Sequence, residues 1–361
     1  MNDNKIRIIA FYLPQYHPIE ENNEWWGEGF TEWTNVGKAK PLFRGHYQPR
    51  VPADLGYYDL RIPEIRERQA ELAKEAGVEG FCYWHYWFGN GRRLLEMPFN
   101  EVLTSEKPDF PFCLGWANES WQAKIWNRDA VTGKVLIEQK YPGRKDVEAH
   151  FYELMPAFRD KRYIQVDDKP FFLIYKPLQY PEVSDFMTQW NRLIKENGIA
   201  EKFYFVANAS NDDEYQTLKD LGFDAVTVNP VSRMVYKSKT ITFFRKVIRR
   251  LFRVPMVINY SSVIKNFTKN IDEKEDLIPF ILPNWDHSPR SASRGTVLHN
   301  STPDLFAKHV EKVMDTVETK KNKLILLKSW NEWGEGNYME PDLKWGKKYL
   351  EILRSFVCKD V

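Results

Sequence analysis

Near its beginning the sequence reads Ile6-Arg7-Ile8-Ile9-Ala10-Phe11-Tyr12-Leu13, a mostly apolar, β-branched run that ends at Pro14-Gln15-Tyr16-His17. A short apolar run bounded by proline predicts a buried strand followed by a loop. Seven further β-rich runs occur along the 361 residues, at Gly80–Trp84, Phe112–Ala117, Phe171–Tyr175, Phe203–Asn208, Ala225–Asn229, Ile278–Asn284 and Leu324–Trp330. Because strands of this near-continuous apolar kind are buried on both faces, they predict a parallel sheet covered by helices.

Amphipathic stretches with helical periodicity lie between these runs, at Ile62–Ala76, Asp146–Phe158, Glu182–Asn197, Glu214–Leu221, Thr302–Thr316 and Lys344–Phe356. About eight strand–helix units predict an α/β fold, a (β/α)8 TIM barrel. A doubly wound open sheet is the alternative, but no glycine-rich phosphate loop follows the first run. Long βα-loop insertions are expected at Ile19–Leu60, Trp121–Pro142 and Val231–Asn259. No linker divides the chain, so residues 1–361 are expected to form one domain.

Composition excludes several classes of function. With 52 basic and 50 acidic residues the net charge is only +2, so nucleic acid is not an expected partner. The three cysteines, Cys82, Cys113 and Cys358, have no metal-ligand spacing, so neither a metal site nor a disulfide scaffold is expected, and no cofactor is indicated. No apolar run reaches the length of a membrane-spanning helix. A reducing, cytoplasmic location is the expectation.

Aromatic residues make up 15% of the chain, with 13 Trp, 18 Tyr and 23 Phe, which fits either a very large core or faces that stack on sugars. Their positions favour the second interpretation for the set. Aromatic and polar residues follow the strand runs, as in Trp84-His85-Tyr86-Trp87, Trp116-Ala117-Asn118-Glu119-Ser120-Trp121, Tyr175-Lys176, Asn208-Ala209-Ser210-Asn211, Asn284-Trp285-Asp286-His287 and Trp330-Asn331-Glu332-Trp333-Gly334-Glu335-Gly336. In a barrel these ends converge on one rim, where active sites are built.

Glu332 and Glu335 are the candidate catalytic pair, because glycoside chemistry needs two neighbouring carboxyl groups. Gly334 and Gly336 allow the chain to bend there, and Trp333 could raise the pKa of one carboxyl. The alternative is that either glutamate simply begins a helix. Glu119, after an earlier strand, is a rival partner for Glu332.

Five blocks in this order identify a resemblance to the WbsX family of polysaccharide-biosynthesis proteins, which are similar to glycoside hydrolase family 99, the endo-acting α-mannosidases and mannanases. The blocks are Ala10-Phe11-Tyr12-Leu13-Pro14-Gln15-Tyr16-His17, Glu28-Gly29-Phe30-Thr31-Glu32-Trp33, Trp84-His85-Tyr86-Trp87, Trp116-Ala117-Asn118-Glu119-Ser120-Trp121 and Asn331-Glu332-Trp333-Gly334-Glu335-Gly336. The resemblance covers most of the chain and implies a (β/α)8 barrel and a retaining mechanism through a 1,2-anhydro sugar.

By this resemblance Glu332 is the base that deprotonates the sugar 2-hydroxyl and Glu335 the general acid/base, with Glu340 as support. It also implies an oligo- or polysaccharide substrate, with lipid-linked glycans included. We expect the reacting sugar and its neighbours to contact Tyr12, Gln15, Tyr16, His17, Trp33, Trp84, His85, Asn118, Glu119, Trp121, Tyr175, Asn208, Trp285, Asn331 and Glu340. Trp126 is a further stacking candidate. One position departs from the hydrolases, which have a histidine where Gly334 stands, so the identity of the sugar does not transfer.

One stretch of the chain is strongly basic. Between Ala225 and Ile271 there are ten Lys or Arg and no Asp or Glu. Within it, a helix over Thr242–Val254 would carry the positive charges on one side, namely Arg245, Lys246, Arg249, Arg250 and Arg253. Such a helix either packs on the barrel with a solvated basic face or docks on an anionic membrane surface. The second interpretation predicts peripheral contact with the inner leaflet.

Three functions remain open at this point. The first is an enzyme that cleaves or transfers a glycosidic bond in a bacterial surface polysaccharide through Glu332 and Glu335. The second is a glycosyltransferase with a nucleotide-sugar or lipid-linked donor in O-antigen or capsule biosynthesis, although the chain has no Asp-x-Asp motif. The third is a carbohydrate-binding barrel without activity, against which the paired acid and base argue.

Overall fold

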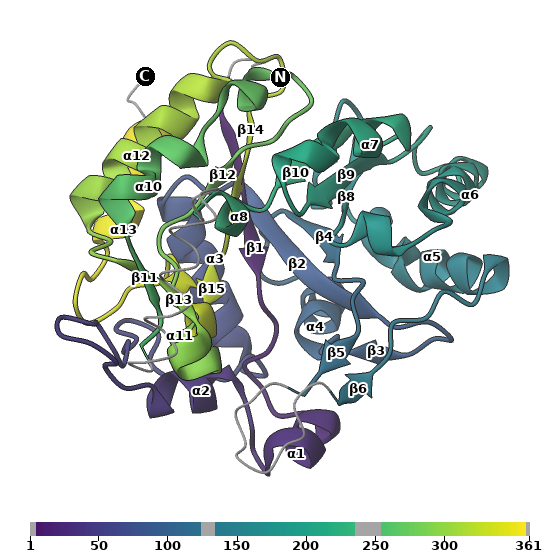
Figure 1. The fold of residues 1–361 in the computed structure, drawn as a ribbon. Coiled ribbons are helices and arrows are strands. Elements are labelled where there is room, and N and C mark those ends of the chain that lie inside the picture. The colour runs from purple at the N-terminus through teal and green to yellow at the C-terminus, as the bar shows by residue number, and fades with distance from the viewer. Residues whose placement is uncertain (1–4, 124–133, 235–253, 359–361) are drawn as a thin grey trace.

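The computed structural model describes residues 5–123, 134–234 and 254–358, and its centre is a barrel of parallel strands (Figure 1). In chain order the barrel strands are β1 (Arg7–Tyr12), β2 (Gly80–Trp87), β4 (Phe112–Trp116), β8 (Lys169–Ile174), β9 (Tyr204–Ala209), β10 (Ala225–Val228), β12 (Phe280–Ile281) and β14 (Leu324–Leu327). Each predicted run overlaps one of them, and β2, β8 and β9 extend beyond the predicted bounds. Parallel pairing connects β10 through β1 to β14 and β12.

The barrel closes between β10 and the start of the β12 segment. The Val226 amide donates to the Asp276 carbonyl, and the Val226 carbonyl accepts from the Ile278 amide, both at 2.8 Å. The predicted (β/α)8 barrel is therefore confirmed, and the doubly wound open sheet is wrong.

Period-two alternation decides what each strand residue contacts. Inside the barrel, Phe11 stacks on Trp84 with ring centroids 4.5 Å apart and lies 5.7 Å from Phe280. On the outside, Phe172 packs against Trp190 of a covering helix at 4.7 Å. Both sides of each strand are dry, which explains why the runs read as continuous apolar segments rather than as alternating ones.

The covering helices follow the predicted amphipathic stretches within a few residues, apart from α4, which had not been predicted. They are α3 (Pro63–Glu75), α4 (Met97–Ser105), α5 (Arg144–Phe158), α6 (Val183–Glu196), α7 (Tyr215–Asp220), α12 (Pro303–Val317) and α13 (Lys348–Val357). Two short strands extend the sheet, β3 (Arg93–Leu94) beside β2 and β7 (Gln165–Val166) beside β8.

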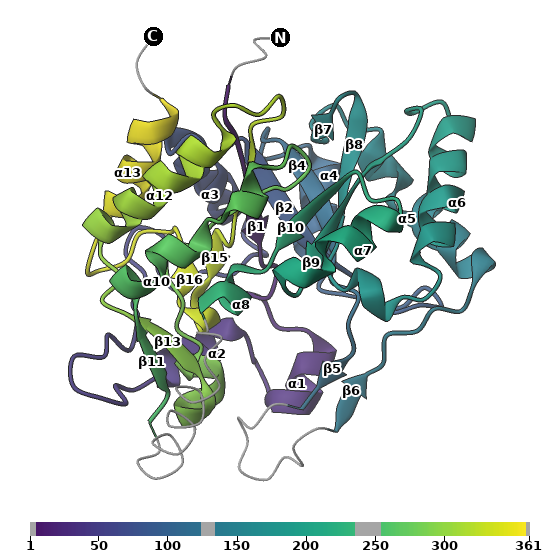
Figure 2. The same cartoon turned by 45° about the horizontal axis from the view of Figure 1, so that its top comes forward.

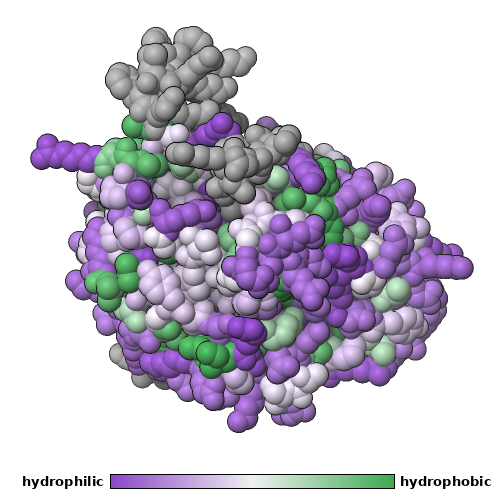
Figure 3. All heavy atoms as spheres, turned by 90° about the horizontal axis from the view of Figure 1, so that it is seen from below, coloured by the Kyte–Doolittle hydropathy of each residue, from purple (hydrophilic) through white to green (hydrophobic). Residues whose placement is uncertain are grey.

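The long βα loops gather at one end of the barrel, opposite the two termini (Figures 1 and 2). They carry α1 (Glu20–Trp26), α2 (Glu32–Lys38), α11 (Ser288–Ser291), the antiparallel strands β5 (Trp121–Gln122) and β6 (Val135–Ile137), and the parallel strands β11 (Met256–Asn259) and β13 (Thr296–His299). Figure 3 views this end, and its described surface is mostly hydrophilic with scattered hydrophobic residues. The carboxyl ends of the barrel strands lie here, so this is the rim where we expect the site.

The third predicted insertion is described at its two ends. Here α8 (Pro230–Met234) and α10 (Tyr260–Phe267) build a second small core with β13, in which Met234, Tyr260, Phe267 and Leu298 are buried. The basic residues Arg245, Lys246, Arg249, Arg250 and Arg253 lie outside the described residues, as does Trp126. Over the described ranges, no helix combines the length and the hydropathy that crossing a membrane requires.

β2 runs to Trp87 and therefore includes residues that had been expected to form a loop. Alternation then puts Trp84 and Tyr86 on the barrel side, and His85 and Trp87 on the helix side. Trp84 and His85 therefore lie on opposite faces of β2, and the contact of each with a sugar stays a prediction. His85 instead meets His150 of α5, with their Nε2 atoms 2.8 Å apart.

Candidate active site

The segment after β14 folds into a tight double turn that brings the two glutamates together. It consists of β15 (Asn331–Glu332), a 3-10 turn over Trp333–Glu335, and β16 (Asn337–Tyr338), which pairs antiparallel with β15. Gly336 adopts φ +56° between them, a conformation that glycine takes without strain. Glu332 ends strand β15 and directly precedes the single 3-10 turn that contains Glu335, so no α-helix begins here and both carboxylates stay on one short turn.

Arg290 of α11 holds both candidate catalytic groups. Its Nη1 donates to Glu332 Oε1 at 3.0 Å and to Glu335 Oε1 at 2.6 Å. The two oxygens are therefore no further apart than the sum of these distances, about 5.6 Å. Roughly 5–5.5 Å separates the carboxyl groups of retaining glycosidases and 6.5–9.5 Å those of inverting ones. The pair has the shorter spacing.

The other side of the guanidinium is anchored by Glu32 of α2, whose Oε2 accepts from Arg290 Nε at 3.1 Å. Glu32 is 1% exposed and Arg290 7%, so this ion pair is cut off from water. Gly334 makes room for it, because a Cβ there would overlap Glu32 Oε2 and lie 2.9 Å from Arg290 Nε. The position where the hydrolases of the resemblance have a histidine is thus filled by a charged pair from two distant loops.

The electrostatic environments of the two glutamates differ. Burial raises the pKa of Glu332, and the neighbouring charge of Glu335 raises it further. The Glu335 carboxyl is also buried, but Arg290 and His287, whose Nε2 is 3.5 Å away, hold its pKa well below the usual range. In the ligand-free protein the first proton therefore goes to Glu332, and Glu335 is charged.

Further polar groups face this pair across the barrel. Lys328, which follows β14, interacts with both glutamates. The buried Tyr86 hydroxyl feels the charges of Glu332 and Glu119, and the Tyr175 hydroxyl those of Glu119 and Glu335. Glu119, the rival carboxylate, therefore belongs to the same rim as the Glu332–Glu335 pair.

A second set of predicted residues supports the turn from behind. The Asn331 side chain bonds both backbone groups of Leu13, accepting from the amide at 2.8 Å and donating to the carbonyl at 3.0 Å. The Tyr16 hydroxyl donates to the Asn331 carbonyl and accepts from the Trp333 amide. These side chains fix the turn to the loop that follows β1, and their contact with a sugar stays a prediction.

Glu340 is buried in the same supporting layer. It accepts from Trp333 Nε1 and Gln69 Nε2, both at 2.6 Å, and from the Tyr58 hydroxyl at 3.0 Å. Burial nevertheless raises the pKa of Glu340 to about 7. Trp333 thus turns its ring toward Glu340 and stacks on Tyr338, with centroids 3.7 Å apart. Burial raises the pKa of Glu332, whereas Arg290 and His287 lower that of Glu335, and a contribution of the Trp333 ring to either pKa stays a prediction.

Tyr12 lies on the helix side of β1, where its hydroxyl donates to Gln69 of α3 at 2.7 Å. Alternation turns Tyr12 outward, so it reaches the turn through Gln69 and Glu340, and its contact with a sugar stays a prediction. The Asn118 side chain likewise makes its hydrogen bonds within the protein. It donates to the Tyr141 hydroxyl and the Lys176 carbonyl and accepts from the Lys176 amide.

The remaining predicted residues lie around the rim. Six of them are half-buried, namely Gln15, Trp33, Trp84, Glu119, Trp121 and Tyr175. Three are buried, namely His17, Asn208 and Trp285. Trp33 Nε1 donates to the Tyr58 carbonyl at 2.7 Å. Trp121 packs edge-on against Tyr86, 5.2 Å between centroids, and against Trp25 at 6.0 Å. Whether these rings stack on sugars stays a prediction.

Asp286 holds the backbone of Glu335 in place. Its amide donates to the Glu335 carbonyl at 2.6 Å. Its fully buried carboxylate accepts from His46 and Gln48 of the first insertion, at 2.8 and 2.6 Å, and from the Ser288 amide. These bonds and the nearby Arg50 lower the pKa of Asp286 to about 2. Loops that follow three strands therefore converge on one turn.

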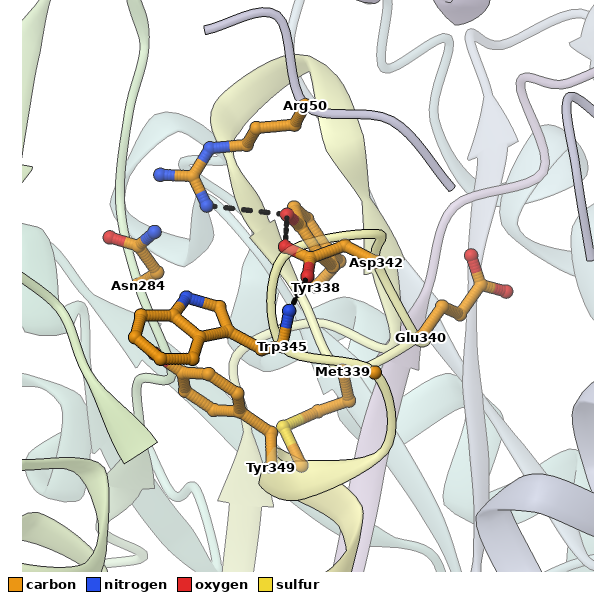
Figure 4. Close-up of a pocket in the computed structure, with 9 residues that line it drawn as sticks. Arg50, Asn284, Tyr338, Met339, Glu340, Asp342, Trp345 and Tyr349 are labelled. Carbon is orange, nitrogen blue, oxygen red and sulfur yellow. Dashed lines mark hydrogen bonds between the residues drawn. The ribbon is translucent and has the colours of Figure 1, made fainter. Parts of the chain in front are cut away.

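A small cavity of about 20 Å³ lies beside this turn. Figure 4 shows Arg50 and Asp342 bonded to the Tyr338 hydroxyl at its wall, and the Glu340 carboxylate pointing away from it. A volume of this size holds about one water and no sugar. In the described ranges no group of three or more His, Cys, Asp or Glu is arranged to hold a metal.

Known proteins resemble this chain in sequence over most of its length. A family model described as "Glycosyltransferase WbsX" matches residues 8–353. A protein called "Uncharacterized protein WxcX" of Xanthomonas campestris pv. campestris is 36% identical over 357 residues, which are 98% of this chain and 50% of that protein. The chain thus spans about half the length of the curated relatives it matches.

Two solved structures resemble the fold over nearly its whole length. A "Glycoside hydrolase-like protein" has a TM-score of 0.62 at 14% identity and covers 98% of this chain and 94% of its own. The GH99 endo-alpha-mannosidase of Bacteroides thetaiotaomicron in complex with BIS-TRIS-propane has a TM-score of 0.57 at 15% identity and covers 99% and 97%. At these identities the likeness establishes a shared fold.

Proposed function

The chain belongs to the WbsX family, and from this premise we propose that it cleaves or transfers a glycosidic bond in a bacterial surface polysaccharide. The observation that carries the proposal is the joint contact of Glu332 and Glu335 with one nitrogen of Arg290 at the carboxyl end of the barrel. A binding barrel has no need for two buried carboxyl groups within about 5.6 Å of each other, whereas retaining glycoside chemistry requires them at this spacing.

The spacing supports a retaining reaction. An inverting enzyme needs room for a water molecule between its carboxyl groups, and the Glu332–Glu335 pair leaves less than that. By family resemblance Glu332 takes the proton of the sugar 2-hydroxyl, and the sugar 2-oxygen attacks the anomeric carbon. Glu335 protonates the oxygen of the leaving group. Water or another sugar, deprotonated by Glu335, then opens the 1,2-anhydro ring, and Glu332 returns its proton to the 2-oxygen. Whether water or a sugar arrives decides between hydrolysis and transfer.

The pKa shifts in the ligand-free protein run against these roles, because the pKa of the proposed acid Glu335 is lowered and that of the proposed base Glu332 is raised. Two arrangements resolve this conflict: the proton passes to Glu335 when substrate binds, or the two glutamates exchange roles. Substrates with an activated aryl leaving group distinguish them, since such groups depart without protonation. The variant that lacks the acid still releases the aryl group in the first step, and the variant that lacks the base does not.

The main test is a panel of α-linked oligosaccharides and lipid-linked glycans, incubated with wild type, Glu332→Gln and Glu335→Gln. We expect each variant to lose at least about a hundredfold in turnover of natural linkages, since removal of an acid or a base costs 10²–10⁴-fold. The matched control is Glu119→Gln, which changes a carboxylate on the same rim. Equal loss in Glu119→Gln together with an active Glu335→Gln would move the acid to Glu119.

A second candidate function is a glycosyltransferase, which the description of the family model favours. Incubation with nucleotide sugars and a lipid-linked acceptor tests it, with release of the nucleotide as the signal. In either case we propose a cytoplasmic protein whose substrate is an oligo- or polysaccharide, and in which the segment around Arg249 and Arg250 contacts the inner leaflet. Liposome flotation of wild type against the double variant Arg249→Glu/Arg250→Glu checks the membrane contact, which equal flotation of the two would exclude.

A further inference from the structure

Arg290 is the one cation that contacts three carboxylates among the described residues of this rim, and no sequence motif marks it as a site residue. It bonds Glu32 through Nε and both Glu332 and Glu335 through Nη1. A guanidinium can make these contacts at once because its donors are fixed in a planar fork, whereas an ammonium is a single point. The position of Arg290 therefore determines how close the two glutamates can lie.

The anchoring of Arg290 depends on three separate loops. Glu32 comes from the insertion after β1, Arg290 from the loop after β12, and the glutamates from the loop after β14. Gly334 lets Glu32 and Arg290 approach the turn, since any side chain there would overlap them. A buried ion pair is costly to assemble unless its geometry is complete, and here each contact is made.

We propose that Arg290, anchored by Glu32 across Gly334, is a positioning residue that holds Glu332 and Glu335 together and decides which of them is charged in the ligand-free protein. Glu335 lies closer to Nη1 than Glu332 does, and it has His287 as a second partner at 3.5 Å. The inference deepens the proposed function, since it concerns the same two glutamates. It does not require that a sugar be identified.

Charged and titratable groups from every neighbouring element surround the pair or its partners, and Arg290, His287 and Lys328 act on the two glutamates directly. The groups are Glu32 on α2, Tyr86 on β2, Glu119 after β4, Tyr175 after β8, His287 and Arg290 at α11, and Lys328 after β14. Arg290 and Glu32 have opposite charges and touch each other. Removing one or the other must therefore move the proton affinity of the glutamates in opposite directions.

The experiment is a pH titration of the glutamate carboxyl carbons by NMR on the full chain labelled with 13C-glutamate, with Glu332→Gln and Glu335→Gln used for assignment. In Arg290→Met we expect the proton affinity of Glu335 to rise at least about tenfold, because a cation that favoured the charged form is gone. In Glu32→Gln we expect both glutamates to titrate at lower pH, because an anion is gone while the amide oxygen still accepts from Arg290. Arg290→Lys keeps the charge and should leave the titration nearer to wild type.

Melting curves and circular dichroism establish that each variant is folded, and Glu32→Gln and Arg290→Lys carry the test if Arg290→Met does not fold. Unchanged titration in folded Arg290→Met, or shifts of the same sign in Arg290→Met and Glu32→Gln, would overturn the proposal. The titration uses no substrate, so its result is independent of the proposed function. If no glycan is turned over and the opposite shifts are seen, the proposed function fails and the role of Arg290 stands. Where turnover is found, Arg290→Lys should lower kcat more than it raises KM.

Discussion

Substitution of Gly334 by alanine tests the packing on which this site depends. The added Cβ would overlap Glu32 Oε2 and lie 2.9 Å from Arg290 Nε, inside the 3.0 Å that real Cβ atoms essentially never cross. Glu32 must therefore move by more than about 1 Å, and its 3.1 Å bond to Arg290 breaks. Glu32 is 1% exposed, so water cannot replace the lost partner.

The expected cost follows from these contacts. Overpacking in a rigid interior costs roughly 1–3 kcal/mol, and loss of one partner of a buried ion pair roughly 3–5 kcal/mol. Both charges remain in Gly334→Ala and part of the contact can re-form, so we expect a loss of about 3 kcal/mol in the free energy of unfolding. The measurement is urea denaturation at pH 7, with the midpoint and slope compared between variant and wild type.

Two controls make the interpretation specific. Gly37 lies in α2, the helix that carries Glu32, and a Cβ there meets nothing within 4 Å. Gly37→Ala should be neutral or stabilising by up to about 1 kcal/mol. In a Glu32→Ala background the clash is gone, so Gly334→Ala should then cost less than about 1 kcal/mol, a coupling of about 2 kcal/mol between the two sites. Equal cost of Gly334→Ala in the two backgrounds would refute the reasoning.

Three further predictions concern groups around the turn. Folded Glu340 keeps its proton up to about pH 7, well above its ordinary pKa of 4.5. Wild-type stability should therefore fall between about pH 5 and 7, by on the order of 3 kcal/mol, and urea titrations of Glu340→Gln should lack this fall. The pKa of Asp286 is shifted in the opposite direction, to about 2, so Asp286→Asn should lower the free energy of unfolding by about 3 kcal/mol at pH 7. The difference in free energy of unfolding between this variant and wild type should become smaller below about pH 4. His85→Gln should lose about 1–2 kcal/mol with its His150 contact and keep kcat and KM within about threefold, whereas a large KM change at full stability would return His85 to the sugar subsite.

Strand runs and helix periods were enough to predict the barrel, because both signals are local. Each predicted run overlaps a barrel strand, and Ile62–Ala76 and Thr302–Thr316 match α3 and α12 within one residue at each end. The end of β2 was predicted too early, because Trp84-His85-Tyr86-Trp87 reads as a rim loop. Its continuation as a strand turned His85 outward.

The candidate site was predicted in part. Glu332 and Glu335 are three residues apart in sequence, and both carboxylates contact the same cation, Arg290. The cation itself carries no sequence signal, since Arg290 follows Asp286-His287 without a motif and its contacts arise from loops 42 to 258 residues away. Glu32 is part of the motif Glu28-Gly29-Phe30-Thr31-Glu32-Trp33, but the motif does not indicate which of its side chains points into the site. The loops after β1, β12 and β14 meet only in the folded barrel, so their contacts cannot be predicted from local sequence patterns.

The charges at this rim bear on the choice between the two candidate functions. Among the described residues, Glu32, Glu332 and Glu335 face Arg290 and Lys328, and Glu119 lies nearby, so the carboxylates outnumber the cations. The diphosphate of a nucleotide sugar leaves through the oxygen that an acid at Glu335 would protonate, and there it would meet this negative surface. A neutral glycan has no such penalty, and positive charge that develops at its anomeric carbon is stabilised. The rim therefore favours a glycan over a nucleotide sugar as donor, and the acceptor, water or sugar, decides whether the family's transferase description holds for this chain.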